Sequence, residues 1–325
     1  MIGLEYGLLP DPVMQRYSVA LNSQLKEHIE SQTGVLRKMF EYQMGWGDEH
    51  GNDVSPLHTS RFHGYLCLLI CESMSGDYMR AMPVSVAVEL IYNFIIAHED
   101  VQSGSPNRNN RPTVWWLWGP GQAINAGDAM HSMARLAIFE LRNSGIHDAM
   151  TFEILSTIDN ACLKLCESKF YELDAIEKLS IDTETYLQNK RSHHSYLYEC
   201  SMLIGSIISG ASGKIKYNLS KAGLELGTAT TICNEIKLFW DTEKQSDQMV
   251  SELLNKKKVL PVIAAFSTDN ANLKRRLGEI YLKRVLEPKD IVSIIKLIEK
   301  KTLKNKKITL NLALNYGSKE EIINA

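Results

Sequence analysis

The sequence predicts a single domain built entirely of α-helices. Apolar residues recur at steps of three and four along most of the chain, alternating strand patterns are nearly absent, and no linker rich in Gly, Ser or Pro divides it. Steps of three and four place side chains on one face of a helix. The chain has 325 residues, 44% of them hydrophobic, which is enough to bury a full core. We therefore expect one all-α domain over residues 1–325.

The predicted helices alternate with clusters of turn-forming residues. Apolar stripes at helical spacing cover residues 84–95, 130–141, 154–165 and 219–236, and the last of these continues for about five turns. Gly, Pro, Asn and Ser gather at residues 51–56, 103–107, 118–121 and 210–213, where we expect the chain to leave one helix and begin another.

Composition and charge exclude several classes of protein. The six cysteines are dispersed, and the first residues lack the basic and apolar regions of a secretory signal, so we expect a cytoplasmic protein. No stretch reaches about 18 uninterrupted apolar residues, so we expect no membrane span. Residues 256–308 carry 15 Lys and Arg against five Asp and Glu. These cations alternate with Leu and Ile at helical spacing, which indicates a solvated helix face, and we expect no nucleic-acid partner.

The most informative stretch for chemistry runs from residue 98 to residue 128. Glu99 and Asp100 end an apolar helix, and a loop carrying Arg108 and Arg111 follows directly. Carboxylates at a helix end can hold Mg²⁺, which prefers oxygen ligands and shares its coordination shell with substrate phosphates. Arginines just beyond them can bind the same phosphates through paired hydrogen bonds. The pattern points to a phosphate-containing substrate.

These residues resemble the trans-isoprenyl diphosphate synthases, or polyprenyl synthetases, which share the class I terpenoid synthase fold. That family carries a DDxxD motif, an RRGxPT sequence and a later Gly-Asp pair, matched here by residues 99–103, by 108–113 and by Gly127-Asp128. The second acidic motif of the family is matched around Asn234 and Glu235. The resemblance implies a helical bundle around a central elongated cavity, an Mg²⁺ cofactor and an allylic prenyl diphosphate substrate. It also implies a homodimer, or a heterodimer with a related synthase.

The acidic motifs depart from the family pattern. The first keeps Glu99 and Asp100 but ends in Ser103, and the second keeps only Glu235, with Asp241 one turn beyond as a substitute. The resemblance implies catalytic roles for Glu99, Asp100 and Glu235. The implied metal ligands are Glu99, Asp100, Asn234, Glu235 and Asp241. We expect metal binding to be weakened or rearranged, and vestigial residues in an inactive relative are the alternative.

The implied substrate-binding residues are also incomplete. The site for isopentenyl diphosphate, the co-substrate, keeps Arg61, but its other cationic positions hold Ser60, His63 and Asn109. Each lost charge-assisted contact removes roughly 1.5–3 kcal/mol. Groups for the allylic diphosphate remain, namely Arg108, Arg111 and Lys257. His193 and His194 stand where the family has a Lys-Thr pair, either as ligands or as ordinary partly buried histidines.

This uneven loss favours a reaction without the co-substrate. We therefore expect a terpene-synthase-like enzyme, in which the carbocation left by diphosphate departure is quenched internally or by water. The alternatives are a non-catalytic subunit of a heteromeric synthase and a chain-elongating prenyltransferase. Phe94, five residues before Glu99, is predicted to form the floor of the pocket. Such a floor favours substrates of about fifteen to twenty carbons through the steric cost of overpacking.

Overall fold

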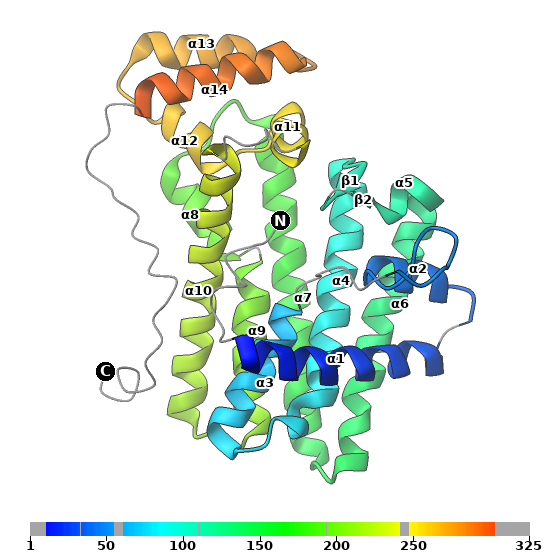
Figure 1. Cartoon of the computed structure of the whole chain (residues 1–325). Helices are drawn as coiled ribbons and strands as arrows, with labels where there is room; N and C mark the ends of the chain where they lie inside the picture. Colours follow the sequence, from blue (N-terminus) through cyan, green and yellow to red (C-terminus); the bar gives the residue numbers. More distant parts are fainter. Residues whose placement is uncertain are drawn as a thin grey trace.

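The computed structural model describes residues 11–32, 34–54, 61–109, 111–192, 194–240 and 247–302. The chain is helical over most of this length, which confirms the predicted fold class (Figure 1). Its longer α-helices are α1 (Asp11–Gln32), α3 (Phe62–Ser75), α4 (Met82–Ser103), α6 (Pro120–Phe139), α7 (Asp148–Glu177), α9 (Ser195–Ile208) and α10 (Gly213–Trp240). The shorter ones are α2 (Arg37–Gln43), α5 (Val114–Trp118), α8 (Thr183–Ser192), α11 (Asp247–Leu254), α12 (Leu260–Phe266), α13 (Ala271–Tyr281) and α14 (Pro288–Thr302).

Helix α4 lies at the centre of the bundle. It packs against α1, α3, α6 and α9, and most of its length is buried because apolar residues occupy several of its faces. Among the described residues, Tyr78–Ser103 is long and apolar enough to cross a membrane, but 78% of its most apolar window is buried inside the fold. The helix ends where Gly104 adopts a left-handed conformation, with φ of 61°. This end carries the acid pair predicted from the sequence.

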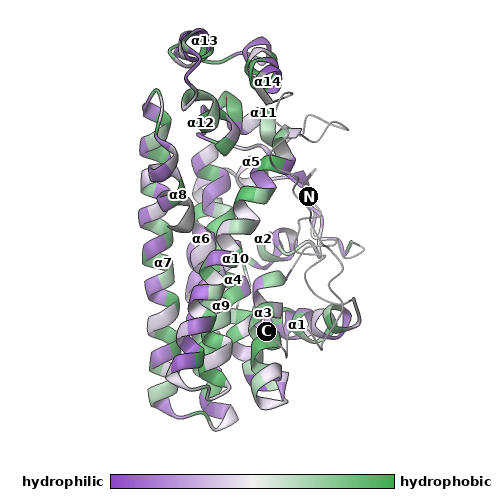
Figure 2. Ribbon diagram, turned by 90° about the vertical axis from the view of Figure 1, so that its left-hand side faces the viewer, coloured by the Kyte–Doolittle hydropathy of each residue, from purple (hydrophilic) through white to green (hydrophobic). Residues whose placement is uncertain are grey.

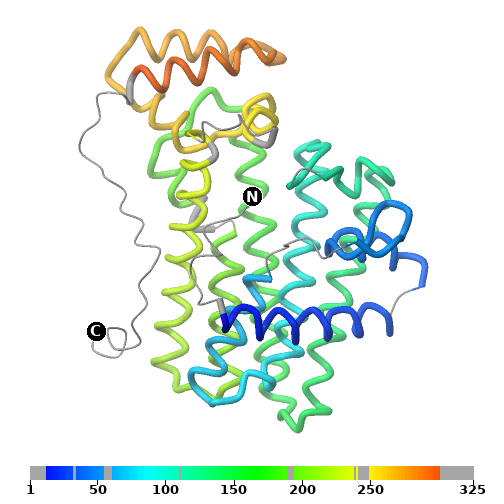
Figure 3. Tube along the Cα trace, viewed as in Figure 1, coloured from blue at the N-terminus to red at the C-terminus, as the bar shows by residue number. Residues whose placement is uncertain are grey.

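The long stripe at residues 219–236 lies on α10, which runs beside α9 (Figure 3). Two glycines allow this contact. A Cβ atom at Gly227 would lie 2.6 Å from the Cα atom of Ser195, and one at Gly223 would lie 2.8 Å from the carbonyl oxygen of Tyr198. Both distances are shorter than any side chain tolerates. Gly223 and Gly227 therefore permit a close contact between α10 and α9.

A short β-hairpin interrupts the helices beyond α4. Its strands are β1 (Asn107–Arg108) and β2 (Arg111–Pro112), with Arg108 opposite Arg111. Asn109 begins the connecting turn with φ of 52°, a conformation that asparagine adopts more readily than most residues. The sequence predicted a loop here. The hairpin matters because it returns Arg108 towards the end of α4.

The last helices form an apolar cluster of their own. Phe239 at the end of α10 packs with residues of α11 to α14, including Leu253, Leu277 and Ile294, all of which are fully buried. In Figure 1 these helices lie across one end of the bundle, above α8 and α10. Helix α11 contacts strand β1, so this cluster reaches the hairpin that follows α4.

Candidate active site

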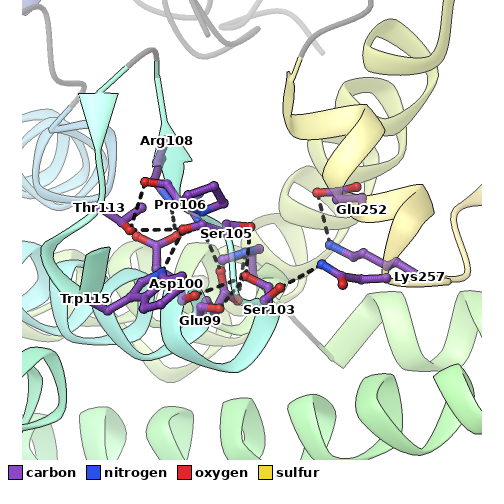
Figure 4. A network of polar contacts seen from close by, with 12 residues as sticks. Glu99, Asp100, Ser103, Ser105, Pro106, Arg108, Thr113, Trp115, Glu252 and Lys257 are labelled. Atoms are coloured by element: carbon purple, nitrogen blue, oxygen red, sulfur yellow. Dashed lines mark hydrogen bonds and ion pairs between the residues drawn. The ribbon is translucent and has the colours of Figure 1, made fainter. Parts of the chain in front are cut away.

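Glu99 and Asp100 lie in the last turns of α4, and both are buried. Arg108 extends from β1 to Asp100, with its Nε and Nη2 atoms each 2.8 Å from Asp100 Oδ1 (Figure 4). Arg108 Nη2 is also 3.8 Å from Glu99 Oε2, and His194 Nε2 lies 3.4 Å from Glu99 Oε1. The structure thus brings together the acid pair and Arg108, which the sequence had grouped, and adds His194 from the start of α9.

Burial and pairing act on this cluster in opposite directions. Burial raises the pKa of Asp100 to about 6, although the Arg108 guanidinium opposes that rise. Burial alone lowers the pKa of Arg108, but the attraction of Asp100 and Glu99 outweighs burial and raises it. Arg108 therefore stays charged, and its charge stabilises the ionised form of the carboxylate that it contacts.

Ser103 occupies the last position of the first acidic motif. Its hydroxyl donates to the carbonyl oxygen of Glu99 at 2.7 Å and to Ser105 Oγ at 3.0 Å. Its own carbonyl oxygen accepts a hydrogen bond of 2.7 Å from Asn255 Nδ2, which belongs to the segment between α11 and α12. Ser103 thus forms hydrogen bonds at the end of α4 and links that end to the segment between α11 and α12. It does not supply the third carboxylate of the family motif.

Lys257 lies across from the acid pair in the same segment (Figure 4). Its Nζ atom is 3.3 Å from Glu252 Oε1, and about a quarter of its side chain is exposed. From this position the Lys257 ammonium group could contact an anionic ligand bound at the end of α4.

Glu235 has two hydrogen-bond partners within the fold, and its role as a metal ligand stays a prediction. Its Oε2 atom accepts a short hydrogen bond from Tyr186 and another, of 2.9 Å, from the backbone N–H of Leu260. It therefore bonds the first residue of α12 and links α8, α10 and α12. Asn234 lies beside it on α10, partly buried. The other residues predicted for this region, Asp241 and His193, lie outside the described residues.

Two arginines predicted to bind substrate face other partners. Arg111 donates to the carbonyl oxygens of Tyr42 and Gly47, at 3.3 and 2.9 Å, and its guanidinium lies 4.1 Å from the centre of the Tyr42 ring. Arg61 is only 2% exposed and donates to the carbonyl oxygen of Met44 at 2.7 Å. Both arginines therefore bind backbone carbonyl groups at the end of α2 and just beyond it. The sequence had suggested that they bind a phosphate.

The co-substrate position at His63 lacks the positive charge that the family resemblance implies. His63 is buried on α3, and burial lowers its pKa to about 3, so it is neutral at physiological pH. Its ring lies 4.8 Å from that of Tyr198 and 5.0 Å from that of Tyr92, measured between centres. An aromatic contact therefore replaces the cation that the family resemblance implies at this position.

A pocket of about 280 Å³ lies between α4 and α7 and reaches Glu99. Phe94 lines it, with its ring centre 4.7 Å from that of His98 and 5.0 Å from that of His131. The remaining lining residues combine apolar and polar side chains: Ile95, His98, Gln102, Cys162, Leu165, Cys166, Lys169, Phe170 and Leu173. The structure thus places Phe94 and Glu99 on one pocket.

Sequence reasoning missed Lys169 and Tyr186. Lys169 lies four residues after Leu165, so it continues the apolar stripe of α7 by one turn, and its side chain is only 13% exposed. A lysine on a buried stripe is a signal that could have been noticed. Tyr186 gave no such signal, because its partner Glu235 is 49 residues away.

The described side chains do not fit an Mg²⁺ site. Among them there is no group of three or more His, Cys, Asp or Glu residues that could hold a metal ion. Asp100 is bound to Arg108, Glu235 accepts from Tyr186 and Leu260, and Ser103 carries no charge. Mg²⁺ requires oxygen ligands that converge in a near-octahedral shell. The expectation of a weakened or rearranged metal site agrees with this arrangement.

The sequence matches the polyprenyl synthetase family over residues 53–298. The chain belongs to this family. It is 29% identical to a geranylgeranyl diphosphate synthase of Mycobacterium tuberculosis over 245 residues, covering 75% of this chain and 69% of the relative. It is 27% identical to a (2E,6E)-farnesyl diphosphate synthase of the same species over 270 residues, covering 79% and 74%.

Solved structures of the family share the fold. The polyprenyl synthetase of Streptomyces coelicolor superposes with a TM-score of 0.77 at 25% identity, covering 89% of this chain and 86% of that one. The geranylgeranyl pyrophosphate synthetase of Pyrococcus horikoshii gives a TM-score of 0.74 at 25% identity, covering 90% and 84%. These relatives are named as diphosphate synthases, so they favour the chain-elongating alternative over the terpene-synthase-like expectation.

Proposed function

We propose that this polyprenyl synthetase is a prenyltransferase that joins isopentenyl diphosphate to an allylic prenyl diphosphate. One observation carries the proposal: an apolar pocket leads from Phe94 to the buried end of α4, where Arg108 and Lys257 provide positive charge. The pocket suits a prenyl tail, and the cations suit a diphosphate. Two relatives are named as geranylgeranyl and farnesyl diphosphate synthases, and these names agree with a substrate that has a prenyl tail and a diphosphate.

The proposed reaction needs a dry pocket and a held diphosphate. The allylic carbon–oxygen bond breaks, the double bond of isopentenyl diphosphate attacks the allylic carbon, and the new product loses a proton. Apolar walls at Ile95 and Leu165, both buried, would exclude water from the cation. Phe94 would limit the tail, so that allylic substrates of about fifteen to twenty carbons fit and a longer tail would overpack the pocket.

Product analysis tests this function. The purified protein is incubated with geranyl, farnesyl or geranylgeranyl diphosphate, each with and without labelled isopentenyl diphosphate. The proposal predicts a labelled diphosphate that is five carbons longer than the substrate, formed only when both substrates are present. Hydrocarbons or alcohols formed without isopentenyl diphosphate would instead establish the terpene-synthase-like reaction.

A second candidate, a non-catalytic subunit, is favoured by the bonding of the acidic motifs. Asp100 is held by Arg108, and Glu235 is held by Tyr186 and Leu260. In the same assay such a subunit would give no product by itself and would change the products of an added synthase of this family.

Oligomerisation is proposed from the outer faces of α6 and α7. In Figure 2, α7 runs along one edge of the bundle. The two helices expose several large apolar side chains, each at 43% or more: Leu136, Phe139, Phe152, Leu163 and Phe170. Large apolar residues grouped on neighbouring helices are typical of a protein–protein interface. We propose that a second copy, or a related synthase chain, covers this face. Light scattering after gel filtration would show twice the mass of one chain, whereas a monomer at micromolar concentration would contradict the homodimer.

A further inference from the structure

Basic side chains from two separate elements contact the acid pair at the end of α4. Arg108 comes from β1, with two guanidinium nitrogens 2.8 Å from Asp100 Oδ1. His194 precedes α9 and lies 3.4 Å from Glu99 Oε1. Lys169 comes from α7 and lines the same pocket as Glu99. The acid pair thus has basic partners, Arg108 and His194, that belong to the protein itself.

The Arg108 contact competes directly with a metal ion. The Asp100 side chain is only 4% exposed, so its carboxylate has little access to water. An Mg²⁺ ion that binds Asp100 Oδ1 would have to displace the charge-assisted hydrogen bond from Arg108 Nε and the Nη2 contact at 2.8 Å, and would leave the guanidinium, itself 28% exposed, without that partner. Ser103 cannot offset this loss with a further negative charge, because its side chain is an uncharged hydroxyl, which donates to the carbonyl oxygen of Glu99.

We propose that Arg108 is a built-in counter-cation of the Glu99–Asp100 pair, so that this pair binds divalent metal ions weakly. The pair then serves to hold the guanidinium at the polar end of the pocket. This inference deepens the proposed function, on which its relevance to a diphosphate rests. It concerns metal affinity, however, which the protein shows whether or not it turns over a substrate.

Metal titration of the full chain without any diphosphate tests the inference. Free Mn²⁺ is followed by electron paramagnetic resonance, and Mg²⁺ is then titrated in competition. Arg108→Gln removes the counter-cation and should tighten Mn²⁺ binding at least about tenfold, and adding Asp100→Asn to that variant should abolish the gain. Arg111→Gln is the matched control, because Arg111 comes from the same hairpin but contacts the carbonyl groups of Tyr42 and Gly47. It should leave the affinity unchanged.

Two results would overturn the inference. One is micromolar Mn²⁺ binding by the wild-type protein that Arg108→Gln leaves unchanged or weakens. The other comes from Ser103→Asp, which adds the missing carboxylate while Arg108 stays in place. This variant also tests the inference if Arg108→Gln does not fold. The inference predicts a change below about threefold for this variant, and a tenfold tightening would contradict it. Because no substrate is present, failure of the product assay would leave either result standing.

Discussion

Glu235 is expected to stabilise the fold by holding three helices together. Its carboxylate accepts from the Tyr186 hydroxyl on α8 and from the first backbone N–H of α12, and its side chain projects from α10. Both Glu235 and Tyr186 are buried, at 9% and 1% exposed. Neither hydrogen bond is therefore easily replaced by water when one partner is removed.

The size of the effect follows from the two contacts. A hydrogen bond to a charged group contributes about 1.5–3 kcal/mol. A carboxylate at the first turn of a helix adds about 0.3–1 kcal/mol. Tyr186→Phe should therefore lower the free energy of unfolding by about 1.5–3 kcal/mol. Glu235→Gln removes the charge from both contacts and should lower it by about 2–4 kcal/mol.

Urea denaturation of both single variants and the double variant measures these changes. The double variant should lose less than the sum of the single variants, because both remove the same hydrogen bond, and the coupling should be at least about 1 kcal/mol. Losses below about 0.5 kcal/mol for both single variants would refute the reasoning. They would leave Glu235 available for another role.

Three further predictions follow from the pocket, the C-terminal cluster and a helix crossing. Phe94→Ala should lengthen the prenyl products, because Phe94 lines the pocket five residues before Glu99, and an unchanged product length in a folded variant would place the floor elsewhere. Burial, aided by the charge of Lys256, lowers the pKa of Lys258 from 10.5 to about 8. The unfolded state then binds more protons between these values, so wild-type stability should rise from pH 8 to pH 10.5 by about 1–3 kcal/mol more than that of Lys258→Met. Equal slopes in urea denaturation would show that Lys258 is not perturbed. Gly127→Ala would place a Cβ atom 2.4 Å from the His98 ring and should cost about 1–3 kcal/mol, and a thermal midpoint equal to the wild-type value would contradict that contact.

The sequence was sufficient to predict the helices and the grouping of residues close together in the chain. Apolar steps located α4, because burial of a helix face selects residues at that spacing. They also located α10, although Ala222 and Ala229 of its predicted stripe are exposed. Arg108 is only eight residues from Asp100, and a short loop after a helix can return a side chain to the helix end. The acid pair and its arginine were therefore predictable together.

The contacts that the sequence did not predict depend on docking of distant elements. Arg108 and Arg111 are three residues apart in similar surroundings, yet one meets a carboxylate of α4 and the other meets carbonyl groups near α2. Glu235 bonds to Tyr186, 49 residues earlier, and to Leu260, 25 residues later. No local pattern encodes such partners. The family resemblance assigned these positions to the substrate or metal, whereas packing gives them structural partners.

A crystal structure with the thiolo analogue of farnesyl diphosphate, which resists loss of its diphosphate, tests the central claim most directly. The account predicts that the diphosphate lies at the end of α4, within hydrogen-bond distance of Arg108 and Lys257, and that the tail enters the pocket between α4 and α7 towards Phe94. An analogue bound elsewhere would contradict the account. So would an analogue whose tail leaves this pocket empty.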